Sequence, residues 1–291
     1  MLREAPNERD IDALRSFGVV NLDKPPGPSA HQVSAWIRDM VGVEKAAHAG
    51  TLDPKVTGCL PVLTGTATRL APALLEGAKE YVAVLELHAS APTDYESVLA
   101  EFEGRLYQKP PRKSAVARRL RVREVYALEA LEVSDDRRQI LIRIRCESGT
   151  YVRKLCHDLG LALGTGAHMG HLRRTATGPF ADGDLVSLQD LADALAEWRE
   201  HEADDWLRAV LAPAERALTH LPSVTIAPSA AREVAEGAPV FAPGVIDAED
   251  AETGALVACY TPNDAVVCLG RLVGDPDAEH GEVVSLERVL V

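Results

Sequence analysis

The sequence predicts an α+β fold in which a mixed-sheet domain, residues 17–220, precedes a small β-barrel domain, residues 221–291. Helical and strand-like periodicities are interspersed along the first range. The second contains short β-type runs separated by Gly, Asp and Pro clusters, which is typical of a small barrel. A length of 291 residues and a hydrophobic content of 46% provide enough apolar side chains for both cores. Residues 1–16 are expected to form a polar N-terminal extension.

The larger domain is expected to begin with a strand and a helix. Residues 17–23 form a short apolar run, which a proline-rich stretch ends. Residues 31–42 carry apolar side chains at helical spacing, which gives the helix one apolar face. A second helix, rich in Ala and Leu, is expected to end at Gly77.

The middle of the chain alternates between strands and helices. Residues 79–88 and 138–149 show the period-two alternation of strands. Between them, residues 105–123 hold eight basic residues, no acidic residue and a Pro-Pro pair, so we expect a surface loop that leads into a strand. A helix is expected to follow Gly149, and an acidic amphipathic helix covers 188–200.

The composition changes near residues 218–230, where the C-terminal domain is expected to begin. One short helix over 230–237 precedes the β-type runs. These runs occupy residues 238–245, 254–260, 265–273 and 283–291.

The net charge of −13 disfavours a nucleic-acid partner until its distribution is considered. Residues 1–180 hold 25 basic and 22 acidic residues, whereas residues 181–291 hold 6 and 22. The basic stretch 105–123 therefore belongs to an otherwise acidic protein. Only seven of the 31 basic residues are lysine, which together with the many acidic residues predicts adaptation to high salt. The alternative is an ordinary acidic cytosolic protein.

Several classes of protein and site are disfavoured. The charged N-terminus lacks the apolar core of a secretory signal, and no run approaches eighteen apolar residues, so we expect a cytoplasmic protein without membrane spans. Five cysteines without C-x-x-C spacing disfavour a zinc ribbon and a disulfide framework. Residues 164–170 miss the dinucleotide-binding spacing, and no P-loop or G-x-S-x-G motif occurs. No carboxylate or cysteine completes a metal-binding spacing with His157, His168 and His171.

The stretch HAGTLDPKVTG, residues 48–58, is the strongest candidate for a functional loop. Gly50, Pro54 and Gly58 predict a rigid turn around Asp53. Such a turn suits a carboxylate that must be held in one place, although an Asp-Pro turn without function would have the same local pattern.

This loop and two other stretches resemble the TruB-type pseudouridine synthases. The others are NLDKPPGPSAHQV at 21–33 and ESGTYVRKLCHDLG at 147–160, while GAKEY at 77–81 and LRRTATGPF at 172–180 fit the same pattern. The sequences TLDPKVTGCL, GTYVRKLCHDLG and GAPVFAPGV are most similar to those of the archaeal and eukaryal Cbf5/dyskerin branch. The resemblance covers residues 17–291. It implies a mixed-sheet catalytic domain followed by an RNA-binding PUA domain.

The resemblance implies that the reaction converts uridine in RNA to pseudouridine, with Asp53 as the catalytic residue. This isomerisation breaks the bond between sugar C1′ and base N1, and the uracil rejoins through C5. A carboxylate beside an oxocarbenium-like C1′ suits that chemistry, as in retaining glycosidases. Asp53 would act as nucleophile or base, and the order of steps stays open. A redox-neutral rearrangement requires no metal or organic cofactor.

The resemblance also implies three supporting residues close to the reacting base. Arg153 would pair with Asp53 and favour its ionised form. Tyr81 would stack on the flipped uracil, and Tyr151 would form a wall of the pocket. The alternatives are a surface ion pair for Arg153 and ordinary core packing for the two tyrosines.

Three further residues are implied at the edge of the site. His48 would stack in the site after a base leaves its helix, and the alternative is a polar loop histidine. Lys24 and Leu172 would line the site, although Lys24 could instead pair with Asp23.

The resemblance implies an H/ACA ribonucleoprotein in which a guide RNA pairs with a substrate RNA, either rRNA or tRNA. The PUA segment would hold the ACA end of the guide, and small H/ACA proteins would dock on the catalytic domain. Basic residues of 105–123 are candidates for phosphate contacts, although charged stretches are often only solvated. The candidates are Arg105, Lys109, Arg112, Lys113, Arg118 and Arg119.

Two other functions remain open at this point. A stand-alone tRNA T-arm enzyme would use the same chemistry without guide RNA or partners. A non-catalytic RNA-binding scaffold would lack Asp53, which is present.

Overall fold

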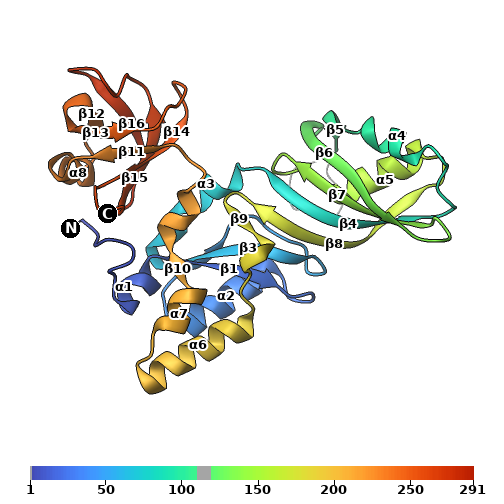
Figure 1. Ribbon diagram of the computed structural model, residues 1–291, viewed down its shortest axis with the longest axis horizontal. Coiled ribbons are helices and arrows are strands. Elements are labelled where there is room, and N and C mark those ends of the chain that lie inside the picture. The colour runs from blue at the N-terminus through green and yellow to red at the C-terminus, as the bar shows by residue number, and fades with distance from the viewer. Residues whose placement is uncertain (1, 110–118) are drawn as a thin grey trace.

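The computed structural model describes residues 2–109 and 119–291, and the strands of these ranges form two sheets (Figure 1). The larger sheet has ten strands, eight of them in the order β10-β1-β3-β8-β4-β7-β6-β5, while β2 pairs with β3 and β9 with β8. It is mixed, because β3 and β8 run parallel and the other named strand pairs antiparallel. The smaller sheet has six strands in the order β12-β16-β15-β14-β11-β13. The predicted fold class is confirmed.

The larger sheet and its helices occupy the chain up to residue 218. Its strands are β1 Gly18–Lys24, β2 Ala46–His48, β3 Thr57–Thr64, β4 Lys79–Leu87, β5 Gly104–Gln108, β6 Arg121–Val133, β7 Gln139–Cys146, β8 Ala167–Thr177, β9 Phe180–Ala181 and β10 Ala212–Pro213. Its helices are α1 Ile11–Ser16, α2 Ala30–Val41, η1 Gly65–Leu70, α3 Ala71–Leu75, α4 Tyr95–Ala100, α5 Val152–Ala162, η2 Asp182–Asp184, α6 Leu188–His201, α7 Asp205–Val210 and η3 Ala214–Leu218.

The smaller sheet follows directly. Its elements are β11 Ser223–Ile226, α8 Pro228–Ala235, β12 Val240–Phe241, η4 Ala242–Gly244, β13 Val245–Ala248, β14 Leu256–Tyr260, β15 Val266–Leu272 and β16 Glu282–Val289. We retain 17–220 and 221–291 as the proposed domain limits.

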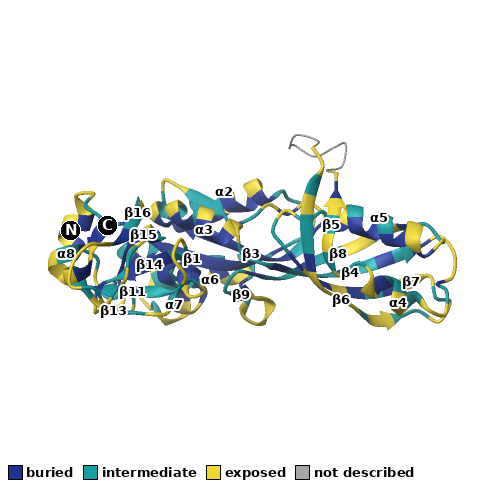
Figure 2. Cartoon of the chain, turned by 90° about the horizontal axis from the view of Figure 1, so that it is seen from above, coloured by how far each residue is buried: buried dark blue, intermediate teal, exposed yellow. Residues whose placement is uncertain are grey.

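The larger sheet carries a separate apolar core at each end. Near one end, α2, α6 and α7 pack against β1 and β3, and α2 begins with a capping box in which Ser29 and Gln32 satisfy each other's backbone amides. At the other end, α4 and α5 pack against β4, β6 and β7 (Figure 1). Figure 2 shows buried residues along the length of the sheet. The site described below lies where the two cores meet.

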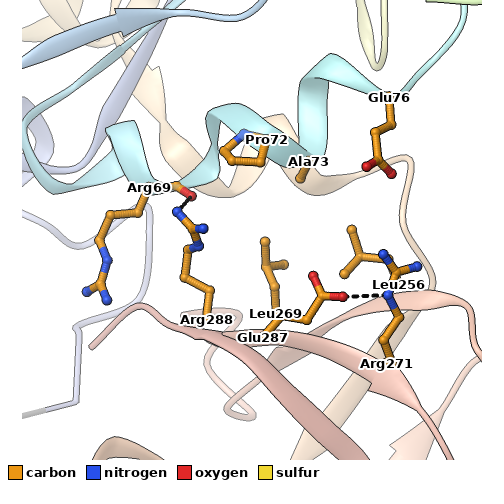
Figure 3. Close-up of a pocket in the computed structure, with 9 residues that line it drawn as sticks. All are labelled: Arg69, Pro72, Ala73, Glu76, Leu256, Leu269, Arg271, Glu287 and Arg288. Carbon is orange, nitrogen blue, oxygen red and sulfur yellow. Dashed lines mark hydrogen bonds and ion pairs between the residues drawn. The ribbon is translucent and has the colours of Figure 1, made fainter.

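The two sheets share part of their apolar interior. Phe17 and Leu63 of the larger unit belong to the same buried cluster as Ala258, Val266 and Leu290 of the smaller one. A cavity of about 50 Å³ remains between α3 and strands β14–β16 (Figure 3). At its edge Arg288 donates to the backbone oxygen of Arg69 at 3.0 Å, and Arg271 pairs with Glu287 at 2.5 Å.

The N-terminal segment differs from the polar extension that we expected. Ile11 and Leu14 of α1 are buried in the core of the larger sheet. Arg9 is buried as well and makes a two-pronged ion pair with Glu215, at 2.8 and 2.6 Å. The charged residues of this segment masked the apolar pair, which is too short to produce a clear period.

The basic stretch 105–123 also differs from the expected loop. Residues of β5 pair with β6 in an antiparallel ladder in which Tyr107 faces Val122. The alternation of Arg105, Leu106 and Tyr107 is a strand signal that the high charge obscured. Residues 110–118 lie outside the described ranges.

Candidate active site

Asp53 lies in the loop that joins β2 to β3. Gly50 and Gly58 both have φ of +95°, a conformation that favours glycine. The backbone oxygen of Asp53 accepts from the Val56 amide at 3.0 Å, and that of Pro54 accepts from the Gly27 amide at 2.8 Å. The loop is thus held from within and from the loop after β1, while the Asp53 side chain stays exposed.

Arg153 reaches Asp53 from the first turn of α5. Its guanidinium donates to Asp53 Oδ2. The side chains are 52% and 55% exposed, so the pair is open to a ligand from solvent. The guanidinium fixes the orientation of the carboxylate through a charge-assisted hydrogen bond.

Lys24, at the end of β1, holds the Asp53 loop from the interior of the protein. Its side chain is fully buried, and Nζ donates to the backbone oxygens of Pro25, Pro54 and Val56 at 2.9, 3.0 and 2.9 Å. Burial lowers the pKa of Lys24, and the nearby Asp53 charge opposes that shift. The pairing with Asp23 that we considered is absent among the described residues, because Asp23 pairs with Arg173 at 2.9 Å.

Tyr81 and Leu172 come together at the junction of the two cores. They lie on the adjacent strands β4 and β8, where Ala83 faces Leu172 and Tyr81 faces Arg174. Both are half-buried and contact the apolar clusters at either end of the sheet. Burial raises the pKa of Tyr81, and the positive charge of Arg174 opposes the rise.

His48, the last residue of β2, is held by two hydroxyls. Nδ1 lies 3.2 Å from Ser34 Oγ and Nε2 lies 3.2 Å from Thr51 Oγ1. Ser34 uses its only proton to donate to the backbone oxygen of Ala30, so it accepts from Nδ1–H. Nε2 is then the acceptor for Thr51 in the neutral ring. Burial lowers the pKa of His48 to about 4, assisted by His31 and Arg174, so the ring is neutral at physiological pH.

Tyr151 connects the start of α5 to β5. It is the N-cap residue of the helix. Its amide donates to Gln108 Oε1 at 2.9 Å, and Gln108 Nε2 donates to its backbone oxygen at 3.4 Å. Gln108 is buried, so this exchange fixes the β5 hairpin beside the helix that carries Arg153.

The predicted RNA-contacting residues are only partly described. Arg105, Lys109 and Arg119 are exposed, as phosphate-binding side chains should be. The predictions for Arg112, Lys113 and Arg118 lie outside the described residues.

Residues 2–109 and 119–291 contain no group of three or more His, Cys, Asp or Glu residues that could hold a metal ion. His168 instead lies 3.1 Å from His88, and His157 lies beside Asp158 at 3.4 Å. In the same ranges, none of the helices combines the length and apolar character that crossing a membrane requires.

Sequence reasoning missed two residues that organise the site. Ser34 sets the proton position on His48, and Arg174 contacts both the loop and Tyr81. The LRRT stretch that contains Arg174 belongs to a motif that resembles the family. The sequence of a strand does not show, however, whether an arginine on it points into the protein or out to solvent. Ser34 gave no signal, since a serine on a helix usually faces solvent or its own backbone.

Hydrogen bonds bring four of the predicted residues together around one loop. Asp53 contacts Arg153 directly, Lys24 holds the loop at Pro54 and Val56, and His48 contacts the loop through Thr51. Such a site can present an ionised carboxylate, in a fixed orientation, to an electrophilic carbon of a bound ligand.

Comparison with protein families covers nearly the whole chain. Residues 38–152 match the model of the TruB family pseudouridylate synthase N-terminal domain, and residues 153–219 match the tRNA pseudouridylate synthase B C-terminal domain. Residues 4–34 match the DKCLD (NUC011) domain, and residues 222–290 match the PUA domain.

Two curated relatives illustrate the similarity. The probable tRNA pseudouridine synthase B of Halobacterium salinarum is 70% identical, over 100% of this chain and 99% of its own. The protein of the same name from Pyrococcus abyssi is 45% identical, over 98% of this chain and 87% of its own. The first comes from a salt-loving genus, which agrees with the predicted adaptation to high salt.

Two solved structures share the fold over 100% of this chain and 90% of theirs. A Cbf5-Nop10-Gar1 complex matches with a TM-score of 0.93 and 45% identity. An H/ACA RNP bound to a substrate RNA containing 2′-deoxyuridine matches with a TM-score of 0.92 and 43% identity.

Proposed function

The chain belongs to the TruB family of pseudouridylate synthases, and we propose that it isomerises uridines in RNA to pseudouridine under the direction of a guide RNA. It is an RNA pseudouridine synthase of the archaeal Cbf5/dyskerin type, so the predicted family and enzyme class are confirmed. The observation that supports the chemistry best is the accessible Asp53 carboxylate, oriented by Arg153 on a rigid loop.

The proposed roles of the side chains follow from their environments. Asp53 acts at C1′ of the flipped nucleotide, where a carboxylate stabilises or traps an electron-poor carbon. Arg153 fixes the orientation of the Asp53 carboxylate. Tyr81 offers a half-buried ring for the uracil, beside Leu172. Neutral His48 offers an uncharged ring that can stack in place of the displaced base.

The proposed assembly is an H/ACA ribonucleoprotein. The similar solved structures contain Cbf5 with Nop10 and Gar1, and an H/ACA RNP with substrate RNA. We propose that this chain binds guide and substrate RNA with small subunits of the same kind, and that residues 221–291 hold the guide. Exposed Arg105, Lys109 and Arg119 are proposed to contact phosphates. A cytoplasmic location is proposed from the buried free thiols, since disulfides are rare in a reducing compartment.

A second candidate function has its own support. Both curated relatives described above are named as tRNA pseudouridine synthases, which favours guide-independent action on tRNA. The two functions use the same carboxylate and differ in how the target uridine is delivered.

Reconstitution separates the two. The chain would be assembled at high salt with small H/ACA proteins, with or without a guide RNA, and given either a guide-matched RNA or an unmodified tRNA. We expect pseudouridine at the paired position only when the guide is present. Product in naked tRNA without a guide would support the second function, and no product in either RNA would contradict both.

A further inference from the structure

We propose that Arg174 is a positioning residue of this active site, which holds both ends of the Asp53 loop in one arrangement beside Tyr81. This inference rests on the proposed function, because the arrangement matters for catalysis only if Asp53 and Tyr81 act on RNA.

The contacts of Arg174 span the loop. Nε donates to the backbone oxygen of Cys59 at 2.7 Å, just after the loop, and Nη2 donates to that of Gly50 at 3.1 Å, just before Asp53. The guanidinium charge also acts on Tyr81, which faces Arg174 across β4 and β8. One planar group on β8 therefore holds both ends of the loop against the strand that pairs with β4.

The loop is shaped to fit this arginine. A Cβ on Gly50 would lie 3.2 Å from Arg174 Nη1, and a Cβ on Gly58 would lie 2.3 Å from the backbone oxygen of Arg174. Both glycines also have positive φ. The close approach between loop and strand therefore requires glycine at both positions.

The charge of Arg174 indicates that stability is not its main contribution. Arg174 is 1% exposed, and within the described ranges its hydrogen-bond partners are backbone carbonyl oxygens rather than a carboxylate. Arg9 is equally buried but has Glu215 as its counter-ion. Burial of an uncompensated charge is costly, and an apolar side chain of similar size often stabilises a fold as well. The guanidinium therefore fixes the geometry of the loop and supplies a positive potential there, rather than stabilising the fold through its burial.

Two variants and a matched control test the proposal. Arg174→Met removes every hydrogen-bond donor of the side chain, and Arg174→Lys retains the positive charge on a single donor nitrogen. The control is the double substitution Arg9→Met with Glu215→Gln, which removes a buried guanidinium together with its counter-ion, far along the chain from the loop. Each protein would be assembled with guide and substrate RNA, below its melting temperature. Three quantities would be measured: hydrogen exchange of the amides of residues 50–59, single-turnover rate and RNA affinity.

We expect Arg174→Met to raise exchange in residues 50–59 and to lower the single-turnover rate by about 100-fold, the loss typical of a displacement near 1 Å, with RNA affinity changed less than about threefold. Arg174→Lys should recover part of both quantities. The control should change the melting temperature but neither the loop exchange nor the rate.

Three results would overturn the proposal. They are unchanged loop exchange in Arg174→Met, a rate equal to that of the unsubstituted chain, and a loss of rate matched by an equal loss of RNA affinity, which would indicate an RNA contact. If the unsubstituted chain made no pseudouridine, the proposed function would fail, whereas the exchange measurement would still show whether Arg174 holds the loop.

Discussion

The Arg153 guanidinium donates to the Asp53 carboxylate, although the two residues lie 100 positions apart in the chain. Asp53 belongs to the β2–β3 loop and Arg153 to α5, which packs in the core at the other end of the sheet. Because both side chains are about half exposed, their ion pair adds little to stability. Its consequence is geometric, since the carboxylate is oriented and still accessible.

Replacement of Asp53 by asparagine should abolish the reaction. Asp53→Asn keeps the shape but removes the charge and the nucleophile, so we expect the single-turnover rate to fall by at least about 10⁴-fold. RNA affinity, measured by filter binding, should stay unchanged. Asp135→Asn, an exposed aspartate in the β6–β7 turn, is the control and should react normally. Turnover by Asp53→Asn near that of the control would remove Asp53 from the chemistry.

Arg153→Ala should slow the reaction while RNA remains bound. Without the guanidinium the carboxylate loses its orientation, and a rate loss of about 100-fold is expected in single-turnover kinetics. Lys154→Ala is the matched control, because Lys154 is the next residue of the helix and pairs with Asp158. Equal rates for the two variants would show that Arg153 forms only a surface ion pair without a role in the reaction.

The stability of the protein should carry a signature of His48 in mild acid. Its pKa is about 4 in the folded chain against about 6.5 in an unfolded one. Between these values the unfolded chain binds a proton that the folded chain does not, so this contribution to the unfolding free energy is complete above pH 6.5 and is lost as the pH falls toward 4. The free energy of unfolding measured in urea should therefore fall more between pH 7 and pH 4 in the unsubstituted chain than in His48→Gln. Parallel curves would contradict a depressed pKa.

Two of the three glycines with φ of +95°, Gly58 and Gly104, offer a test of the fit between loop and strand. Gly58→Ala would place a methyl group 2.3 Å from the Arg174 backbone oxygen, whereas Gly104→Ala has the same φ and no atom within 4 Å. We expect a stability loss of roughly 1–2 kcal/mol for Gly104→Ala from backbone strain alone. The loss should be about 3 kcal/mol or more for Gly58→Ala, because overpacking adds to the strain. Equal urea midpoints would mean that the loop moves aside at no cost.

Strands and helices whose apolar residues recur at a regular spacing could be predicted from the sequence. Those whose spacing is short or interrupted by charged residues could not. Residues 79–88 and 138–149 alternate regularly and form the neighbouring strands β4 and β7. The strand β5 was missed because its alternating side chains are charged and aromatic rather than apolar. The helix α1 was missed because only Ile11 and Leu14 of it are buried. In both cases pairing with distant residues stabilises a segment whose local pattern is weak.

The sequence by itself determined which side chains are candidates for the chemistry, through the resemblance of the motif around Asp53, whose glycines and proline also constrain the backbone locally. It also determined most of the helices and strands, since periodicity is a local property, but not α1 or β5. The tertiary structure alone decided that Lys24 is buried under the loop rather than paired with Asp23, that Ser34 sets the proton on His48, and that Arg174 faces inward. The physical reason is that burial and hydrogen-bond partners depend on residues up to 124 positions apart, which only the packed fold brings within 3.2 Å of each other.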